Sequence, residues 1–235
     1  MVRRPPQLIV ALDVPTLAEA LSLREKLDGV ADFFKVGKEL FTGVGPEILR
    51  SLHPARVFLD LKFHDIPKTV AGAVKAAARH GVAIVDVHAS GGKAMMSAAA
   101  DAAKEADGSS RPLVLGVTVL THLADEDLEA LGFREKSQEQ VLRLAGLAAE
   151  SGLDGVVASA LEAEAIRAAH GEGLQILVPG VRPAWSKDQH DQKRVATPAE
   201  AARRGASYVV VGRAIALDPS PRTAAERILE ELSQA

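Results

Sequence analysis

The amino-acid sequence predicts an α/β fold, a single (β/α)8 barrel, and two observations lead to it. Eight short apolar runs rich in β-branched residues recur along the 235 residues, and segments rich in Ala, Leu, Glu and Arg separate them. Near-continuous apolar runs are typical of parallel strands that are buried on both faces. The predicted strands are "LIVALD" (8–13), "FFKVG" (33–37), "VFLDLK" (57–62), "AIVDVH" (83–88), "LVLGVTVL" (113–120), "DGVVAS" (154–159), "LQILVPG" (174–180) and "SYVVVG" (207–212).

The segments between these strands carry the signals of helix ends. Thr16 and Glu19 have the spacing of a capping box at the first of them. Pro67 stands where a helix begins, and Gly81 follows where the same helix ends. The helices predicted in this way are 16–27, 67–81, 138–152, 197–205 and a terminal amphipathic helix, 223–235.

The alternation of strand and helix runs through the whole chain without a linker or a low-complexity tract. We therefore expect one TIM-barrel domain over residues 1–235. The alternative is an open doubly wound sheet, which usually carries a glycine-rich nucleotide loop after its first strand. The first strand here runs into "ALDVPT", which has no such loop, and the barrel is favoured.

Composition excludes several classes of function. The formal net charge of −3 does not provide the basic surface of a nucleic-acid binder, so we expect no nucleic-acid partner. No apolar stretch reaches the roughly 18 residues of a membrane span, and no signal peptide is recognisable, so we expect a cytoplasmic protein without a membrane partner. The chain has no cysteine, which rules out disulfides, a thiol nucleophile and thiolate metal sites.

Polar residues gather where the predicted strands end. In a barrel these carboxyl ends meet at one rim, where active sites lie. Strand starts carry little charge beyond Asp154. The polar residues near or just after the strand ends are Asp13, Lys35, Asp60, Lys62, Asp65, Asp86, His88, Thr118, Thr121, Ser159, Arg182 and, after Gly212 at the end of the eighth strand, Arg213.

Side-chain alternation refines the third strand. Asp60 and Lys62 share one face with Phe58, while the opposite face of the strand is entirely apolar and suits packing under helices. Asp60 and Lys62 therefore point into the barrel mouth, where Asp13 and Lys35 could join them in an array of alternating charge. A buried ion-pair network of structural importance is the alternative. Charges at three adjacent strand ends favour function.

A divalent metal is a second alternative for this cluster. Carboxylates are hard oxygen ligands, and four acids are available: Asp13, Asp60, Asp65 and Asp86. Lys35 and Lys62 lie among them and already neutralise their charge, so we expect no metal. Two histidines accompany the cluster: His64 has the parity of a structural residue, and His88 suits either a base or a hydrogen-bonded barrel residue.

A phosphate site is expected on the other side of the mouth. Barrels often bind phosphate with the loops that follow strands seven and eight. The loop at 179–198 is long and polar and contains Arg182 and Gln192, which could fold over an anion. Gly212 permits close approach of the backbone, and Arg213 follows it. The alternative for this loop is a surface segment without a ligand.

These residues resemble the bacterial type of the orotidine 5′-phosphate decarboxylase family, over essentially the whole chain. The most specific match is "DLKFHDIP", since the wider superfamily shares only a D-x-K-x-x-D pattern. Lys68 departs from the asparagine that family members often carry. The other matching segments, in order, are "ALDV", "FKVGKELF", "VHASGG", "GVTVLT", "GLDGVVASA", "PGVRP", "DQKRVATP" and "VVGRAI".

The resemblance implies a homodimer that converts orotidine 5′-monophosphate into UMP and CO2 without a cofactor. It makes Lys62 the catalytic lysine of a Lys35–Asp60–Lys62–Asp65 array, in which Asp65 reaches in from the neighbouring subunit together with Thr69. The resemblance implies that Asp13 and Lys35 bind the ribose hydroxyls and that the segment at Thr121 contacts the pyrimidine. It implies that the phosphate is bound by Arg182, Gln192, Gly212 and Arg213.

Two other functions remain open at this level. One is a metal-dependent decarboxylase or lyase of sugar phosphates from the same superfamily, against which "HDIP" after the lysine and the "ALDV" and "FKVG" segments argue. The other is a barrel that binds a phosphate ligand without catalysis, which the intact Lys62, Asp60 and Asp65 disfavour.

Overall fold

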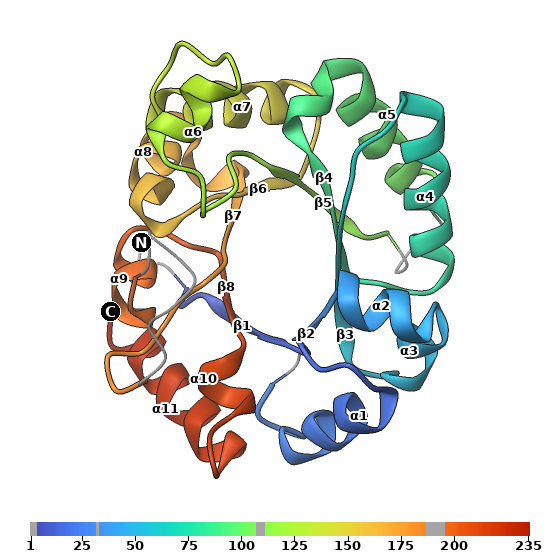
Figure 1. Cartoon of the computed structure of the whole chain (residues 1–235), viewed down its shortest axis with the longest axis vertical. Coiled ribbons are helices and arrows are strands. Elements are labelled where there is room, and N and C mark those ends of the chain that lie inside the picture. The colour runs from blue at the N-terminus through green and yellow to red at the C-terminus, as the bar shows by residue number, and fades with distance from the viewer. Residues whose placement is uncertain (1–3, 32, 107–110, 187–195) are drawn as a thin grey trace.

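The computed structural model describes residues 4–31, 33–106, 111–186 and 196–235. Eight parallel strands pair in chain order, and β1 pairs with β8 to close a barrel. Figure 1 looks into this ring of strands, with the helices around it. The predicted (β/α)8 barrel is therefore confirmed. The strands are β1 (Gln7–Ala11), β2 (Phe33–Gly37), β3 (Arg56–Phe63), β4 (Ile84–His88), β5 (Leu113–Val117), β6 (Gly155–Val157), β7 (Gln175–Val178) and β8 (Tyr208–Val211).

Helices follow the strands in the described parts of the chain, and the five predicted from sequence are among them. The α-helices are α1 (Leu17–Lys26), α2 (Lys38–Val44), α3 (Glu47–Ser51), α4 (Pro67–Arg79), α5 (Gly92–Lys104), α6 (Asp125–Ala130), α7 (Ser137–Glu150), α8 (Ala160–His170), α9 (Pro198–Arg203), α10 (Arg213–Ala216) and α11 (Pro221–Ser233). Two 3-10 turns, η1 (Ala89–Gly91) and η3 (Gly171–Gly173), complete them. None of these helices is both long and apolar enough to cross a bilayer.

Helix ends form for the local reasons that the sequence suggested, with one correction. Pro67 occupies the first turn of α4, and Gly81 beyond its end has a φ of 71°, which favours glycine. The hydroxyl of Thr16 caps α1 by accepting the N–H of Glu19 at 3.3 Å. The Glu19 carboxylate accepts from that same hydroxyl and not from the Thr16 backbone, so only half of the predicted capping box exists.

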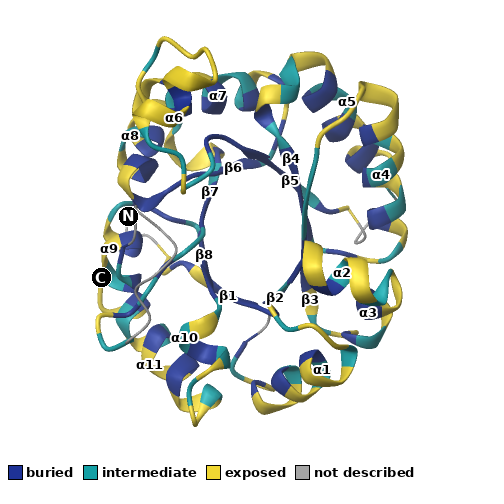
Figure 2. Ribbon diagram, in the orientation of Figure 1, coloured by how far each residue is buried: buried dark blue, intermediate teal, exposed yellow. Residues whose placement is uncertain are grey.

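Two apolar cores hold the barrel. The larger core lies between the outer face of the strands and the helices, and Figure 2 shows the buried inner faces of those helices. The smaller core fills the barrel interior, where Phe33 packs edge-on against Tyr208 near the strand starts. The buried residues of this inner core are Ile9, Ala11, Phe33, Phe58, Ile84, Leu115, Val117, Val157, Leu177, Tyr208 and Val210. These side chains fill the barrel interior between the strand starts and the cavity at the carboxyl ends.

The strands β1, β5, β6, β7 and β8 end earlier at their carboxyl ends than predicted. β5 stops at Val117, and Thr118 directly after it uses its hydroxyl to bond the carbonyl of Val157 at 2.8 Å. β1 likewise ends before Asp13. Other predicted polar residues lie within the strands themselves: Lys35 in β2, Asp60 and Lys62 in β3, and Asp86 and His88 in β4.

Candidate active site

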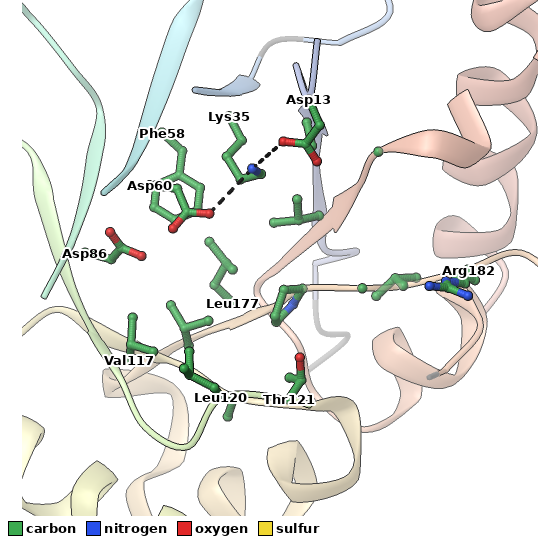
Figure 3. A pocket seen from close by; sticks show the side chains of 18 of the residues that line it. Asp13, Lys35, Phe58, Asp60, Asp86, Val117, Leu120, Thr121, Leu177 and Arg182 are labelled. Carbon is green, nitrogen blue, oxygen red and sulfur yellow. Dashed lines mark hydrogen bonds and ion pairs between the residues drawn. The ribbon is translucent and has the colours of Figure 1, made fainter. Parts of the chain in front are cut away.

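The carboxyl ends of the strands surround a cavity of about 280 Å³. Its size suits a small molecule, and its walls combine apolar and charged side chains. Apolar side chains from the inner core form its floor, including Phe58, Val117 and Leu177. Lysine and aspartate side chains lie on one wall of the cavity, and arginine side chains lie on another (Figure 3). The polar side chains that the sequence placed at one rim therefore share one cavity with an apolar floor.

Lys35 links the first two strands at this rim. Its Nζ donates to Oδ1 of Asp13 at 2.8 Å and lies 3.5 Å from Oδ2 of Asp60, as the dashed lines of Figure 3 show. A Cβ on Gly37 would approach Nζ to 3.0 Å, so the glycine leaves room for the lysine. Burial lowers the pKa of Lys35, but the charges of Asp60 and Asp13 outweigh it and raise the pKa above its usual value.

Asp60 lies between the two ammonium groups of the site. Its Oδ1 accepts a short hydrogen bond from Nζ of Lys62, and Lys35 lies on its other side. Burial is the largest influence and raises the pKa of Asp60, yet the charges of Lys35 and then Lys62 together lower it below the usual range. Asp60 is therefore ionised near neutral pH and holds both lysines in place by charge.

The backbone at Lys62 departs from regular strand geometry. Between β3 and β4, Leu59 pairs with Val85 and Phe63 pairs with Val87, so β3 advances four residues while β4 advances two. Lys62 has a φ of 52°, a left-handed conformation that costs a non-glycine residue about 1–3 kcal/mol. Sequence alternation assumed a regular strand through Lys62, which is wrong. The side chain still faces the cavity because the bulge turns it there.

Asp86 is the member of the cluster to which the sequence gave no role in the reaction. It lies on β4 with 1% of its surface exposed and lines the cavity. Its Oδ1 accepts the backbone N–H of Lys62 at 2.8 Å, and its Oδ2 lies 3.9 Å from the Lys62 Nζ. Burial, and then the charge of Asp60, raise the pKa of Asp86 well above its usual value. The sequence placed Asp86 among the polar residues near the strand ends but gave no indication of this bond.

The arginine wall lies across the cavity from the lysines. Arg182 and Arg213 both line it, together with Gly212. A Cβ on Gly212 would lie 3.3 Å from Oδ2 of Asp13, so this glycine allows β8 and Asp13 to approach closely. The N–H of Arg182 donates to the carbonyl of Ala196 at 2.9 Å, which joins the two described ends of the long loop. Gln192 lies outside the described residues.

Thr121 lies between these two walls. It follows β5 and lines the cavity next to Leu120, and Figure 3 shows both below the arginine side.

Asp65 and Thr69 do not contribute to the cavity of their own chain. Both are exposed in the chain, and neither lines the cavity. The Asp65 carboxylate accepts the N–H of Ile66 at 2.6 Å, and Ile66 itself is 66% exposed. The structure therefore brings together Lys35, Asp60 and Lys62 of the array implied by resemblance, with Asp65 on the surface beside it.

The two histidines form a pair next to the lysines. The rings of His64 and His88 have centroids 5.1 Å apart. Burial, and then the charge of His64, lower the pKa of His88 to about 4. His88 is therefore neutral at neutral pH. Within the described residues, no group of three or more histidines and acids is arranged to hold a metal ion.

Comparisons with known proteins agree with this geometry. Residues 6–228 match the model of the family described as "Orotidine 5'-phosphate decarboxylase / HUMPS family". A Moorella thermoacetica protein named orotidine 5′-phosphate decarboxylase is 52% identical, with 96% of this chain and 92% of that protein covered. A Vibrio cholerae protein of the same name is 48% identical, with 98% of both covered.

Solved structures give the same result. The crystal structure of orotidine 5′-phosphate decarboxylase from Lactobacillus acidophilus superposes with a TM-score of 0.83 at 37% identity, and 97% of this chain and 99% of that chain are covered. The chain belongs to the orotidine 5′-phosphate decarboxylase / HUMPS family.

Proposed function

We propose that the chain catalyses the decarboxylation of orotidine 5′-monophosphate to UMP and CO2 without a cofactor. The observation that supports this most is the Lys62 ammonium, which Asp60 and Asp86 flank at the edge of an apolar cavity. Two relatives that are 52% and 48% identical to this chain, and that align over more than nine-tenths of their length, are named for this activity.

The chemistry requires a fixed positive charge beside one carbon. Loss of CO2 from C6 of the pyrimidine leaves an electron pair in the plane of the ring, which the ring carbonyls cannot delocalise. A preorganised ammonium at that point stabilises the developing carbanion most where water is excluded. Lys62 is the cation that meets these conditions, since its Nζ bonds Asp60 beside the apolar side chains of Phe58 and Leu177.

Lys62 then completes the reaction as a general acid. The electron pair of the broken C6–CO2 bond takes a proton from Nζ, and C6–H replaces C6–CO2. Asp60 lies in hydrogen-bond contact with Nζ and holds it in position before the transfer. Lys35, fixed by Asp13 and Asp60, holds Asp60 in position and is available to a ribose hydroxyl together with Asp13.

The rest of the substrate would span the cavity. We assign the pyrimidine to the segment at Thr121 and the phosphate to Arg182, Gln192, Gly212 and Arg213. The two arginines supply charge-assisted donors on the wall opposite the lysines. Binding energy from a phosphate distant from C6 can serve to orient the reacting carbon against Lys62.

We further propose that the chain acts as a homodimer, with Asp65 and Thr69 entering the neighbouring site. The exposure of Asp65, Thr69 and the apolar Ile66 in the single chain supports a contact there. An acid that enters near the substrate carboxylate would destabilise the bound substrate by repulsion.

The charges disfavour the metal-dependent sugar-phosphate lyase. A divalent cation between Asp13 and Asp60 would have to displace the Lys35 ammonium, which already bonds Asp13 and lies close to Asp60. A cation between Asp60 and Asp86 would meet Lys62 in the same way. The acids of this cluster are thus already neutralised by lysines.

The proposal is tested by incubating the purified chain with orotidine 5′-monophosphate and following its ultraviolet absorbance. We expect stoichiometric UMP and CO2, with the same rate in buffer that contains EDTA. Absence of UMP from a folded protein, or turnover that EDTA abolishes and Mg²⁺ restores, would contradict it. A parallel incubation with a sugar-phosphate keto acid reports on the alternative.

A further inference from the structure

We propose that Asp86 is a positioning residue, which as a neutral carboxyl group anchors the backbone of Lys62 and so directs its ammonium toward Asp60 and the substrate. The inference rests on the proposed decarboxylation, because it concerns how the lysine of that reaction is held. Asp86 lines the cavity but is almost fully buried, with 1% of its surface exposed.

The first support is the bulge of β3. Lys62 is the one non-glycine residue with positive φ in the described parts of the chain. A strained conformation persists only where surrounding contacts favour it over the relaxed one. The bulge removes the N–H of Lys62 from the regular ladder between β3 and β4, and Oδ1 of Asp86 accepts that N–H at 2.8 Å instead. Asp86 therefore replaces the lost strand pairing at the residue where the side chain turns inward.

The second support is the surroundings of the other carboxyl oxygen of Asp86, Oδ2. Oδ2 of Asp86 is buried and has no hydrogen-bond partner in the described residues. An ionised oxygen in that position would carry a large desolvation cost. The Lys62 Nζ lies 3.9 Å away and makes its short hydrogen bond to Asp60 instead. A protonated Asp86 avoids the cost of a buried charge and can donate its proton to the Asp60 carboxylate, while Oδ1 keeps its acceptor role.

The charges around Asp86 agree with a neutral group. Asp60 and Lys62 face it from β3, and Lys35 follows from β2 behind Asp60. On the other side, its strand partner on β5 is the apolar Leu115, and along β4 the next inward residue is His88. With Asp86 neutral, the carboxylates of Asp13 and Asp60 balance the two ammonium groups. The raised pKa of Asp86 points the same way.

Neutrality has a consequence for the reaction. An ionised Asp86 would compete with Asp60 for the Lys62 ammonium and would draw the side chain back toward β4. A neutral Asp86 fixes the backbone only, and the ammonium remains directed toward Asp60 and the cavity. Displacement of a catalytic group by about 1 Å can cost about 10²-fold in rate.

Three variants separate these contributions. Asp86→Asn keeps an oxygen acceptor and is neutral at every pH, whereas Asp86→Ala removes the acceptor. Asp154→Ala is the matched control: its Oδ2 accepts the N–H of Val114 at 2.9 Å, also between strands, but at the opposite end of the barrel. For each folded variant we would measure kcat, KM for orotidine 5′-monophosphate, the dissociation constant of UMP and the thermal midpoint. The infrared carbonyl band of a protonated carboxyl would be recorded for wild type and Asp86→Asn.

We expect Asp86→Asn to keep kcat within about threefold of wild type, because it preserves a neutral acceptor. We expect Asp86→Ala to lose about 10²-fold in kcat with little change in UMP binding, and Asp154→Ala to lose thermal stability without loss of kcat. The carboxyl band should be present in wild type at neutral pH and absent in Asp86→Asn.

Two results would overturn the inference. Wild-type kcat in Asp86→Ala would show that the anchor is dispensable, and an Asp86→Asn variant that loses about 10²-fold would show that the site needs a charged carboxylate. If Asp86→Ala does not fold, Asp86→Asn and the infrared band decide the question. A wild-type chain that does not decarboxylate the substrate would instead refute the proposed function, whereas the band would still report the state of Asp86.

Discussion

Nζ of Lys35 lies 3.5 Å from Oδ2 of Asp60, which joins the end of β2 to the end of β3. Asp13 on one side and Lys62 on the other extend the contact into a row of alternating charge. Lys35 and Asp60 have side chains only 12% and 14% exposed, so solvent screens their attraction weakly. Each ionised group of the row therefore depends on its neighbours.

Asp60→Asn tests this dependence. Removal of the carboxylate leaves two buried ammonium groups with reduced compensation, and loss of one partner of a buried pair costs about 3–5 kcal/mol. We expect a large drop in the free energy of unfolding in urea and a loss of kcat of about 10²-fold, because Lys62 loses its partner. Asp101→Asn, which breaks the exposed pair with Lys104, is the control and should leave both quantities near wild type. Wild-type kcat in Asp60→Asn would refute the account of the row.

Arg182→Ala and Arg213→Ala test whether the arginine wall binds the phosphate. Loss of a charge-assisted hydrogen bond of about 1.5–3 kcal/mol lowers kcat/KM by about 10- to 100-fold for orotidine 5′-monophosphate. The same variants should act on orotidine, which lacks the phosphate, as slowly as wild type does. Arg203→Ala on the exposed face of α9 is the control for loss of a positive charge. Equal losses on both substrates would argue against a phosphate role.

Mixed subunits test whether Asp65 serves the neighbouring site. An Asp65→Ala protein refolded with a Lys62→Ala protein should form hybrid dimers in which one of two sites is intact. Random pairing in a symmetric dimer predicts recovery of about a quarter of wild-type activity. Asp60→Asn refolded with Lys62→Ala is the control, since both changes fall in the same chain's row and no hybrid site is intact. No recovery in the first mixture would mean that Asp65 does not act across an interface.

The stability of the chain should fall in mild acid because of His88. Its pKa in the folded chain is about 4, below the ordinary 6.5, so the unfolded chain binds this proton first as the pH falls. His88 thus contributes a loss of stability that develops between about pH 6.5 and 4. We expect the unfolding free energy of His88→Gln, measured by urea titration, to fall less steeply with decreasing pH over this window than that of wild type. Above this window the two curves of unfolding free energy against pH should be parallel. A slope equal to wild type between these values would contradict the assignment.

Local sequence signals were sufficient for the barrel and for much of the site. Apolar runs identified all eight strands, since strands buried on both faces need apolar side chains throughout. Alternation alone directed Asp60 inward beside Phe58, where the structure has it. The regular face of a strand is a local property, and a single sequence reveals it.

The remaining features depend on contacts between distant residues. The bulge at Lys62 involves an acceptor on another strand, Asp86, which is 24 residues away in sequence. Side-chain alternation predicted correctly that the Lys62 side chain points into the cavity, although the strand is irregular there. The bulge turns the side chain inward. The surface position of Asp65 likewise depends on how the chain turns into α4, and the role proposed for it in a neighbouring site rests on the family resemblance.

The most direct test of the central claim compares wild type with Lys62→Ala in the conversion of orotidine 5′-monophosphate, with UMP binding measured in parallel. Lys93→Ala, which removes an exposed lysine paired with Glu150, is the control. Because the proposed mechanism gives Lys62 both the stabilising charge and the proton, we predict a loss in kcat of at least about 10²–10⁴-fold, with UMP still bound. Turnover by folded Lys62→Ala at a rate near wild type would contradict the account.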